Sequence, residues 1–226
     1  MHARLDEAGK VTAIVKQTCC PQMALPLSVD AYWRTLRPSL RYTLQRKRKY
    51  LERQGTVAYR QAKCGEDIDT AWNAFTALHQ MRWGTRSRGG GAFRDARFCA
   101  FHGEIVPRLH NLGWLDLTLL YLNGRPLAGI YGYRHEGTYY YYLPGFDPDR
   151  VPKASPGMLL LAHCIERAIE AGCHRVDLLQ GHAHYKTSWA RHLTRCLSVR
   201  IYNRTWRALI SHLVDSVTHG AKIVLR

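Results

Sequence analysis

"WLDLTLLYLNGRPLAGIYGYRHEGTYYYYLPGF", residues 114–146, holds three apolar runs that are joined by two short turns. Asn123-Gly124 lies between the first two runs, and Asn-Gly in that position is the strongest short-range signal for a β-hairpin. The third run begins directly after Gly137 and is rich in tyrosine, a residue that favours strands. The stretch therefore predicts an antiparallel meander of three strands.

Segments with other patterns lie on both sides of the meander along the chain. Apolar residues recur at helical spacing in several of them, and others have the composition of strands. The predicted helices are 29–36, 38–54, 67–83, 93–113, 155–172 and 206–223, and the further predicted strands are 11–26, 56–63, 173–179 and 195–203. This order predicts an α+β fold whose mixed, mostly antiparallel central sheet is flanked by helices.

Proline and serine predict where several of these elements end. Pro21 and Pro26 are expected to end the first strand. Pro107 is expected to bend or break the helix that contains it, because proline cannot donate the helical hydrogen bond. Ser155 is expected to cap the next helix, with Pro156 in its first turn.

The composition is that of a folded, strongly basic protein. The chain has 226 residues with 46% hydrophobic and 22% charged side chains, which argues against disorder. It carries 33 Lys and Arg against 17 Asp and Glu, a formal charge of +16. Such a balance favours a polyanionic or phosphate-bearing partner. The basic helix 38–54 could bind tRNA or another polyanion, or it could be an ordinary solvated helix face.

The cysteines and the chain start predict a cytoplasmic protein. None of the seven cysteines forms a Cys-x-x-Cys pair, so free thiols in a reducing compartment are expected. The first twenty residues carry charges throughout, unlike a secretion signal. No apolar run approaches the roughly 20 residues of a membrane span. The sequence leaves the oligomeric state open.

"QGHAHYKTSWA", residues 180–190, is the stretch with the most chemistry. His182 and His184 could bind zinc together with Cys164, Cys173 or His174, but their spacings match no zinc template, so no metal is predicted. The stretch could instead hold catalytic acid and base groups. The remaining interpretation is a structural loop whose lysine caps a carbonyl and whose tryptophan packs on the core.

Five motifs occur in order: "GRPLAGIYGY", "YYYYLPGFDP", "SPGMLLLAHCIERAIEAG", "RVDLLQG" and "YKTSWA". Together they resemble the acetyltransferase-like domain named for cellulose biosynthesis, the CelD-like family of the GNAT superfamily, which is related to the Fem peptidyltransferases. The resemblance implies a GNAT-like fold over residues 18–205. Family members usually have a further lobe ahead of this segment, so residues 1–17, whose pattern predicts a strand or arm, are either the remnant of a lost lobe or belong to a chain whose lobe is a separate protein. The apolar pattern of residues 206–226 predicts a C-terminal amphipathic helix.

The resemblance also implies an activity. A family member moves an acyl group from acetyl-CoA or another acyl-CoA to an amine on a small molecule or sugar, in polysaccharide or cell-envelope biosynthesis. A minority of relatives take the acyl group from aminoacyl-tRNA. The alternative is a non-catalytic or Fem-like, tRNA-dependent domain whose basic helix binds nucleic acid or another polyanion.

The donor site implied by the resemblance lies where the third meander strand leads into the next helix. The start of that helix favours anions through its free N–H groups and its dipole. The superfamily's glycine-rich pyrophosphate signature is absent, and "KASPG" stands in its place. A well-capped core helix is the alternative interpretation. The candidate cofactor-binding residues are Arg150, Lys153, Ser155, Gly157 and Gly145, the last because Pro144-Gly145 is expected to break the strand and splay it.

Four residues are candidates for catalysis. Amine acylation needs a neutral amine, a polarised thioester carbonyl and a proton donor for the leaving thiolate. Tyr185 could donate that proton, Lys186 could stabilise negative charge, and Asp177 could orient a base or bind a cationic acceptor. His184 could act as the base. The family pattern carries the Tyr-Lys pair and the aspartate but not the histidine, so His184 is the weakest of the four candidates.

Overall fold

The computed structural model describes residues 11–62, 68–84, 91–180, 184–190 and 192–203, with 205–208, 210–211 and 213–214. Within these ranges the chain forms two compact units. One is made from residues 21–179 and 183–192, and the other from residues 1–20, 180–182 and 193–226. The predicted division into 1–17, 18–205 and 206–226 stays a prediction.

The described elements alternate between helices and strands. The strands are β1 (Val11–Ala24), β2 (Val57–Gln61), β3 (Leu115–Leu122), β4 (Arg125–His135), β5 (Thr138–Phe146), β6 (Arg175–Asp177) and β7 (His192–Tyr202). The helices are α2 (Val29–Thr35), α3 (Pro38–Glu52), α4 (Ile68–Trp83), α5 (Ala96–Asn111), α6 (Pro156–Glu170) and α7 (His184–Trp189), with single 3₁₀ turns at Ala92–Arg94 and Pro152–Ala154. In the part of the chain described, no helix is long and apolar enough to cross a membrane.

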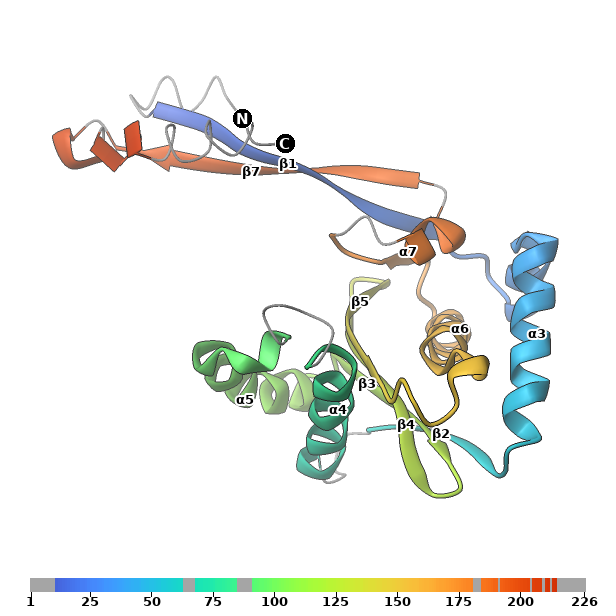
Figure 1. The fold of residues 1–226 in the computed structure, drawn as a ribbon. Helices are drawn as coiled ribbons and strands as arrows, with labels where there is room; N and C mark the ends of the chain where they lie inside the picture. The colour runs from blue at the N-terminus through green and yellow to red at the C-terminus, as the bar shows by residue number, and fades with distance from the viewer. Residues whose placement is uncertain are drawn as a thin grey trace. The chain divides into compact units, whose positions relative to one another are not determined.

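The strands form one sheet in the order β2-β3-β4-β5-β6-β1-β7. Pairing is antiparallel from β2 through β5 and between β6 and β1, and parallel between β5 and β6. The β3–β4 hairpin turns at Asn123 and Gly124, whose φ angles of 52° and 73° are those that a tight two-residue hairpin turn needs. The predicted meander and the mixed, mostly antiparallel α+β fold are confirmed (Figure 1).

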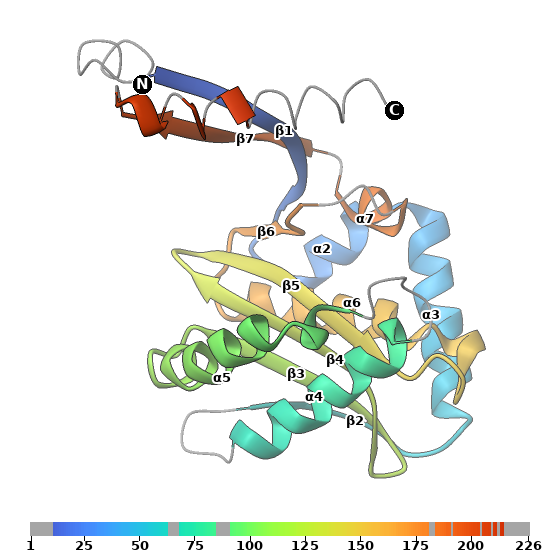
Figure 2. The same ribbon diagram turned by 60° about the vertical axis from the view of Figure 1, so that its left-hand side comes forward.

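Helices cover both faces of the meander, as Figures 1 and 2 show. Successive residues of β3 alternate between two hydrophobic clusters. Leu117 and Leu119 pack with Phe75 of α4, while Leu120 and Leu122 belong to the cluster that contains α2, α3 and α6. Each fully buried leucine contributes roughly 1.5–3 kcal/mol. The alternation of side chains along a strand therefore builds two cores from one run of apolar residues.

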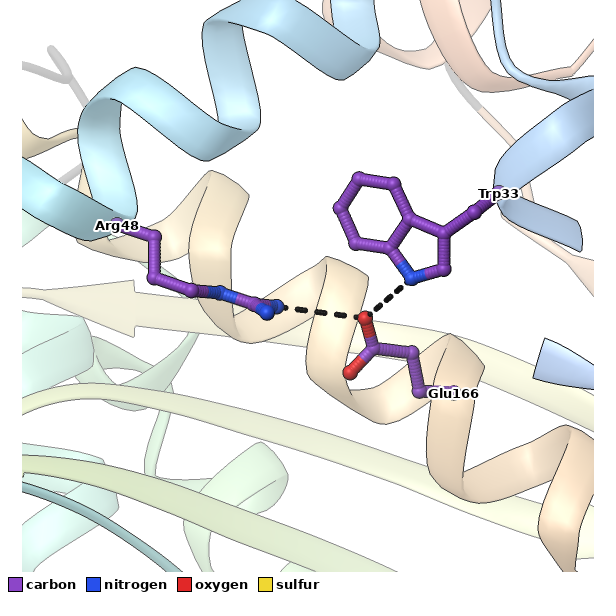
Figure 3. A network of polar contacts seen from close by, with 3 residues as sticks. All are labelled: Trp33, Arg48 and Glu166. Carbon is purple, nitrogen blue, oxygen red and sulfur yellow. Dashed lines mark hydrogen bonds and ion pairs between the residues drawn. The ribbon is translucent and has the colours of Figure 1, made fainter. Parts of the chain in front are cut away.

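A partly exposed polar network ties three helices together at the edge of the core that contains α2, α3 and α6 (Figure 3). Glu166 of α6 accepts a 2.9 Å hydrogen bond from the Trp33 indole of α2 and a 3.3 Å ionic hydrogen bond from Arg48 of α3. The Lys47 ammonium of the same helix donates to the carbonyl of Lys153 at 3.0 Å. Two cations of the predicted basic helix face are therefore held by the protein itself.

Some of the expected element ends differ from the structure. β1 continues through Pro21 and ends at Ala24, shortly before Pro26, and Pro107 does not break α5. Tertiary packing overrides a single lost hydrogen bond in each element. Ser155 lies directly before α6 but has a left-handed backbone (φ 51°) and makes no side-chain capping bond.

Candidate active site

Strands β5 and β6 separate soon after they pair (Figure 2). β6 pairs with β5 only over Thr138–Tyr140, whereas β4 pairs with β5 as far as Phe146. Within the described residues, the β6-facing edge of β5 beyond Tyr140 therefore has no partner strand. The expected strand break at Pro144 does not occur, because β5 continues to Phe146. Proline is tolerated on an unpaired strand edge because it has no N–H group that would need a hydrogen-bond partner there.

A pocket of about 490 Å³ lies beside this unpaired edge. Its walls come from the end of α4, the end of β5 with the turn that follows, the first turn of α6, and α7. Arg82 is the one cation among the lining residues and Asp147 the one carboxylate. The rest of the lining is largely aromatic or aliphatic, including Tyr141, Phe146, Pro156, Met158, Tyr185 and Trp189. A pocket with apolar walls and a few polar groups is the usual form of a small-molecule site.

Two tyrosine hydroxyls meet in this pocket. Tyr185 of α7 donates a hydrogen bond to the hydroxyl of Tyr141 of β5, with 3.4 Å between the oxygens. Burial raises the pKa of Tyr141 well above the ordinary tyrosine value, the nearby Tyr185 adds to the rise, and the Arg82 guanidinium opposes it. Tyr141 therefore stays protonated at neutral pH and can donate a hydrogen bond to a group that becomes negative beside it.

Helix α4 is held against β5 by direct contact between the two backbones. A Cβ atom at Gly145 would lie 2.5 Å from the backbone nitrogen of His79. One residue earlier in β5, the carbonyl of Pro144 accepts a 3.0 Å hydrogen bond from Nδ1 of the buried His79. Arg82 follows on the same helix, with its guanidinium 4.6 Å from the centre of the Phe146 ring. Gly145, predicted to bind cofactor, thus allows the close packing that positions Arg82.

The first turn of α6 offers few groups to a phosphate. Pro156 has no N–H, and the N–H of Met158 bonds to the Ser155 carbonyl at 2.9 Å. The Arg150 side chain donates to the carbonyl of Leu122 at 2.8 Å. Of the other predicted cofactor-binding residues, Ser155 and Gly157 line the pocket, and Lys153 is exposed just before them.

Lys186 and Trp189 support the loop that precedes α7. The Lys186 ammonium donates to the carbonyl of Leu178 at 2.6 Å and to that of Leu179 at 3.3 Å, and only 8% of the residue is exposed. Leu179 has a left-handed backbone (φ 54°), so the ammonium stabilises a sharp turn after β6. Trp189 is buried and packs with the core. This geometry matches the interpretation of a lysine that caps carbonyls.

Asp177 ends β6 on the sheet face opposite Tyr141. It lies across from Tyr140 in β5, which in turn lies across from Tyr133 in β4, and side chains opposed in this way share a face. The rings of Tyr133 and Tyr140 stack with 5.0 Å between their centroids. The buried carboxylate accepts 2.7 Å hydrogen bonds from the Gln22 amide and the Leu179 N–H. Asp177 and Tyr141 therefore stand on opposite sides of the sheet at the point where β5 and β6 separate.

This combination of a separating strand pair and an adjoining pocket agrees with a match between residues 38–187 and the sequence model of the acetyltransferase (GNAT) domain. The chain belongs to the GNAT acetyltransferase family. The match covers the basic helix α3, the meander, α6 and the Tyr185-Lys186 pair. The narrower CelD-like assignment stays a prediction, as does the cytoplasmic location.

Solved structures share the fold of this GNAT domain at low sequence identity. FemX aligns with a TM-score of 0.66 at 12% identity, over 95% of this chain and 70% of FemX. L-PGS from Bacillus licheniformis aligns with a TM-score of 0.57 at 13% identity, over 97% of this chain and 70% of that one. A conserved protein from Bacteroides thetaiotaomicron aligns with a TM-score of 0.53 at 13% identity, over 88% of this chain and 66% of that one. No curated protein matches the sequence.

The side chains of the metal candidates in the 180–190 stretch lie outside the described residues. His184 is the first residue of α7, but its side chain lies outside the described residues, as does all of His182. Cys164 and Cys173, the other zinc candidates, are both buried in the core. Among the described residues, no three His, Cys, Asp or Glu side chains come together as a metal site would need.

Sequence reasoning did not single out two residues that line the pocket beside β5, Tyr141 and Arg82. Tyr141 is one of four consecutive tyrosines, and only the strand alternation distinguishes it from its neighbours. Arg82 lies at the end of an amphipathic helix, where a cation is an ordinary complement to the helix dipole. The signal for Arg82 is weak: it stands next to Trp83, so a guanidinium and a ring are placed together at a helix end.

Proposed function

We propose that this domain transfers an acyl group from an acyl-CoA to an amine, with the reaction centred on Tyr141 and Tyr185. The observation that carries the proposal is the hydroxyl pair inside a pocket that adjoins the unpaired edge of β5. Membership of the GNAT family supports acyl transfer as the reaction class.

The unpaired edge of β5 suits the amide-bearing arm of CoA. A strand edge presents N–H and C=O groups that pair with an extended partner, which is how many proteins hold peptide-like ligands. The arm would lie along residues 141–146, with its methylene groups against the apolar pocket walls. The Gly157 N–H and the exposed Lys153 are then the groups nearest to the helix start that could contact a phosphate.

The acceptor amine would approach from the opposite face, beside Asp177. Each carboxylate oxygen of Asp177 accepts one short hydrogen bond and keeps further lone-pair capacity for an ammonium group. The stacked rings of Tyr133 and Tyr140 provide an apolar surface beside it. In a chain with a formal charge of +16, a carboxylate at this position favours a cationic acceptor.

The chemistry assigned to the tyrosines is proton donation. The acceptor ammonium first releases one proton to solvent. The neutral amine nitrogen then bonds to the acyl carbon, the carbon–sulfur bond breaks, and the leaving sulfur takes the Tyr185 hydroxyl proton. The second proton that the nitrogen loses also goes to solvent, from which Tyr185 is reprotonated. Tyr141, kept protonated by burial, can donate a hydrogen bond to the Tyr185 oxygen while that oxygen is negative. Lys186 holds the turn before α7 and so has a positioning role.

The test combines binding with turnover. Calorimetric titration with acetyl-CoA should give saturable binding that persists at moderate salt, and addition of amines, amino sugars among them, should release free thiol. Tyr185→Phe should lower the rate of thiol release by about 10²–10⁴-fold without abolishing acetyl-CoA binding. Tyr42→Phe, a change on the exposed surface of α3, is the matched control. Turnover by Tyr185→Phe equal to that of the control would show that the hydroxyl pair is not the proton donor.

A second donor, aminoacyl-tRNA, is favoured by the start of α6. Pro156 contributes no N–H to the first turn of α6, and the Arg150 side chain is bound to the Leu122 carbonyl. The pyrophosphate of CoA would therefore find few hydrogen-bond partners there. The fold likeness to FemX and the exposed cations Arg46 and Lys49 of α3 fit this donor. Replacing both cations by Ala should then weaken tRNA binding and reduce its salt dependence. The same change should leave acetyl-CoA binding unaltered.

A further inference from the structure

Two carboxylates are buried in the described parts of the chain, and only one of them has a counter-ion. Asp116 of β3 is 3% exposed and forms an ion pair with the Arg134 guanidinium of β4, with 3.2 Å between nitrogen and oxygen. Asp177 is 8% exposed, and its hydrogen bonds come from neutral donors, the Gln22 amide and the Leu179 N–H. No ion pair of the described residues includes it. Because buried charges in proteins are normally paired, Asp177 is suited to an external cation.

Another pocket, of about 330 Å³, opens on the sheet face that carries Asp177. Tyr133 and Tyr140 line it and stand opposite each other on β4 and β5, and Asp177 on β6 is the next residue of the same row. Burial raises the pKa of Tyr133, and two neighbouring tyrosines and then the Asp177 carboxylate add to the rise. Since neighbouring strands are about 4.8 Å apart, a short methylene chain reaches from the pocket to the carboxylate.

Aromatic rings form most of the wall of this second pocket. The Tyr133 and Tyr140 rings stack on each other, and the Trp114 ring lies on the His135 ring with 4.3 Å between their centroids. Leu109 of α5 also lines the pocket. The Trp114 N–H donates to the Leu109 carbonyl at 2.9 Å, and the Trp114 carbonyl accepts a 2.7 Å bond from the β4 backbone. The indole is therefore held at the pocket although 39% of the residue is exposed.

We propose that this pocket holds the acceptor and that the acceptor is an arylalkyl amine, a primary ammonium group joined to one aromatic ring by a short methylene chain. The ring of the ligand lies among the rings of the pocket, and its ammonium binds Asp177. Tyrosine and tryptophan faces also attract cations, which adds to the attraction. The identification of the ligand as the acceptor rests on the proposed function, whereas its binding depends only on the pocket and the carboxylate.

An amino sugar fits this pocket less well. Its ring carries several hydroxyl groups, and each one that leaves water needs a new hydrogen-bond partner. The lining offers two tyrosine hydroxyls and one imidazole among otherwise apolar side chains. An arylalkyl amine needs one polar partner, which Asp177 supplies. Acylation turns its nitrogen into a neutral amide, so the attraction to the carboxylate is lost and the product is released.

The first test is calorimetric titration of the full chain with 2-phenylethylamine. Three other ligands each lack one feature: propylamine has no ring, 2-phenylethanol has no charge, and N-acetyl-2-phenylethylamine is the neutral product. We expect saturable binding of 2-phenylethylamine at one site, and at least about tenfold weaker binding of these three ligands and of glucosamine. No saturable binding of 2-phenylethylamine, or an equal affinity for glucosamine, would overturn the proposal.

Two variants locate the binding site. Asp177→Asn keeps the shape of the side chain and removes its charge, so it should weaken 2-phenylethylamine binding by at least about tenfold and leave 2-phenylethanol binding unaltered. Trp114→Leu removes one ring of the wall and should weaken both ligands; as a change at a partly exposed residue, it decides the question if Asp177→Asn does not fold. Phe101→Leu changes an exposed ring of α5 outside the pocket and is the matched control. Affinities equal to that of the control would contradict the assignment.

Turnover separates this inference from the proposed function. Thiol release from acetyl-CoA should have a kcat/KM at least about tenfold higher with 2-phenylethylamine than with glucosamine. Binding of 2-phenylethylamine without any thiol release would support the amine site and count against acyl transfer. Thiol release with glucosamine but not with 2-phenylethylamine would refute this class of acceptor and leave acyl transfer standing.

Discussion

Adding one methyl group at Gly145 should separate helix α4 from strand β5. In a Gly145→Ala protein the new Cβ atom would lie 2.5 Å from the His79 nitrogen, and 2.8 Å from both the His79 Cα and the Leu78 carbonyl carbon. All three are backbone atoms of α4, so no side chain can rotate out of the way. Gly145 does not lie in the left-handed region, so alanine fits its backbone conformation and the effect is purely one of space.

The size of the effect follows from these distances. The shortest contact must grow from 2.5 Å to 3.4 Å, a shift of 0.9 Å, to become an ordinary van der Waals contact. A gap of about that width forfeits roughly a quarter to a half of the attraction between facing atoms. Overpacking typically costs about 1–3 kcal/mol, and we expect the upper end because the obstacle is backbone. For a chain of this length, about 3 kcal/mol lowers Tm by roughly 6–12 °C.

Thermal and urea unfolding followed by circular dichroism would measure this change, with Gly103→Ala as the matched control. Gly103 lies in the middle of α5, and a Cβ atom there would meet nothing within 4 Å. The control should be stabilised by roughly 0.5–1 kcal/mol, since alanine is the better helix former. The two Gly→Ala changes are thus expected to have opposite signs. A Gly145→Ala protein as stable as wild type would refute the close backbone contact between α4 and β5.

Three further changes test other parts of the structure. Glu166→Gln removes the ionic partner of Arg48, and chemical unfolding should show that the free energy of unfolding falls by about 0.5–1 kcal/mol. Glu170→Gln, on the exposed surface, should lower it by less. Burial lowers the pKa of His163 to about 4, so the unfolded chain binds a proton first as pH falls below 6.5, and stability should drop between pH 6.5 and 4. That drop should shrink in His163→Gln, and an unchanged pH profile would contradict the assignment. The Cys20 and Cys196 sulfurs lie 3.3 Å apart, so oxidised glutathione should join them in a disulfide, seen as a loss of about 2 Da by intact-mass analysis. Retention of both free thiols after that treatment would count against the pairing of β1 with β7.

Local signals in the sequence predicted the elements well and their ends less well. Asn123-Gly124 fixes its hairpin because the left-handed turn depends only on the two residues that form it. Pro107 and Pro21 give equally strong local signals, yet α5 and β1 continue through them. In both cases the rest of the element keeps its pairing or packing, and one missing N–H does not outweigh that. The Asn-Gly pair, which favours a particular backbone conformation, was therefore a more reliable predictor than the prolines, which only remove one hydrogen-bond donor.

The candidate site was predicted in part, for a reason that Tyr185 and Gly145 illustrate. Tyr185, whose catalytic role stays a prediction, lines the pocket because the turn after a strand places side chains at the open end of a sheet. Gly145 was assigned to cofactor binding because Pro144-Gly145 was expected to break and splay the strand, and that role stays a prediction; the structure adds that a Cβ atom there would collide with the backbone of α4. A glycine in a sequence shows that space is restricted but not what restricts it.

Arg82 shows where sequence reasoning stops and what the structure adds. Its place in the pocket depends on α4 lying directly on β5, which depends on Gly145 in a different part of the chain. The guanidinium then lies over the Phe146 ring and opposes the rise in the pKa of Tyr141. Stability and chemistry are therefore coupled through one interface. A substitution that moves α4 should take Arg82 away from Tyr141 and so raise the pKa of that hydroxyl further, as well as lower the unfolding temperature, even though it touches neither group.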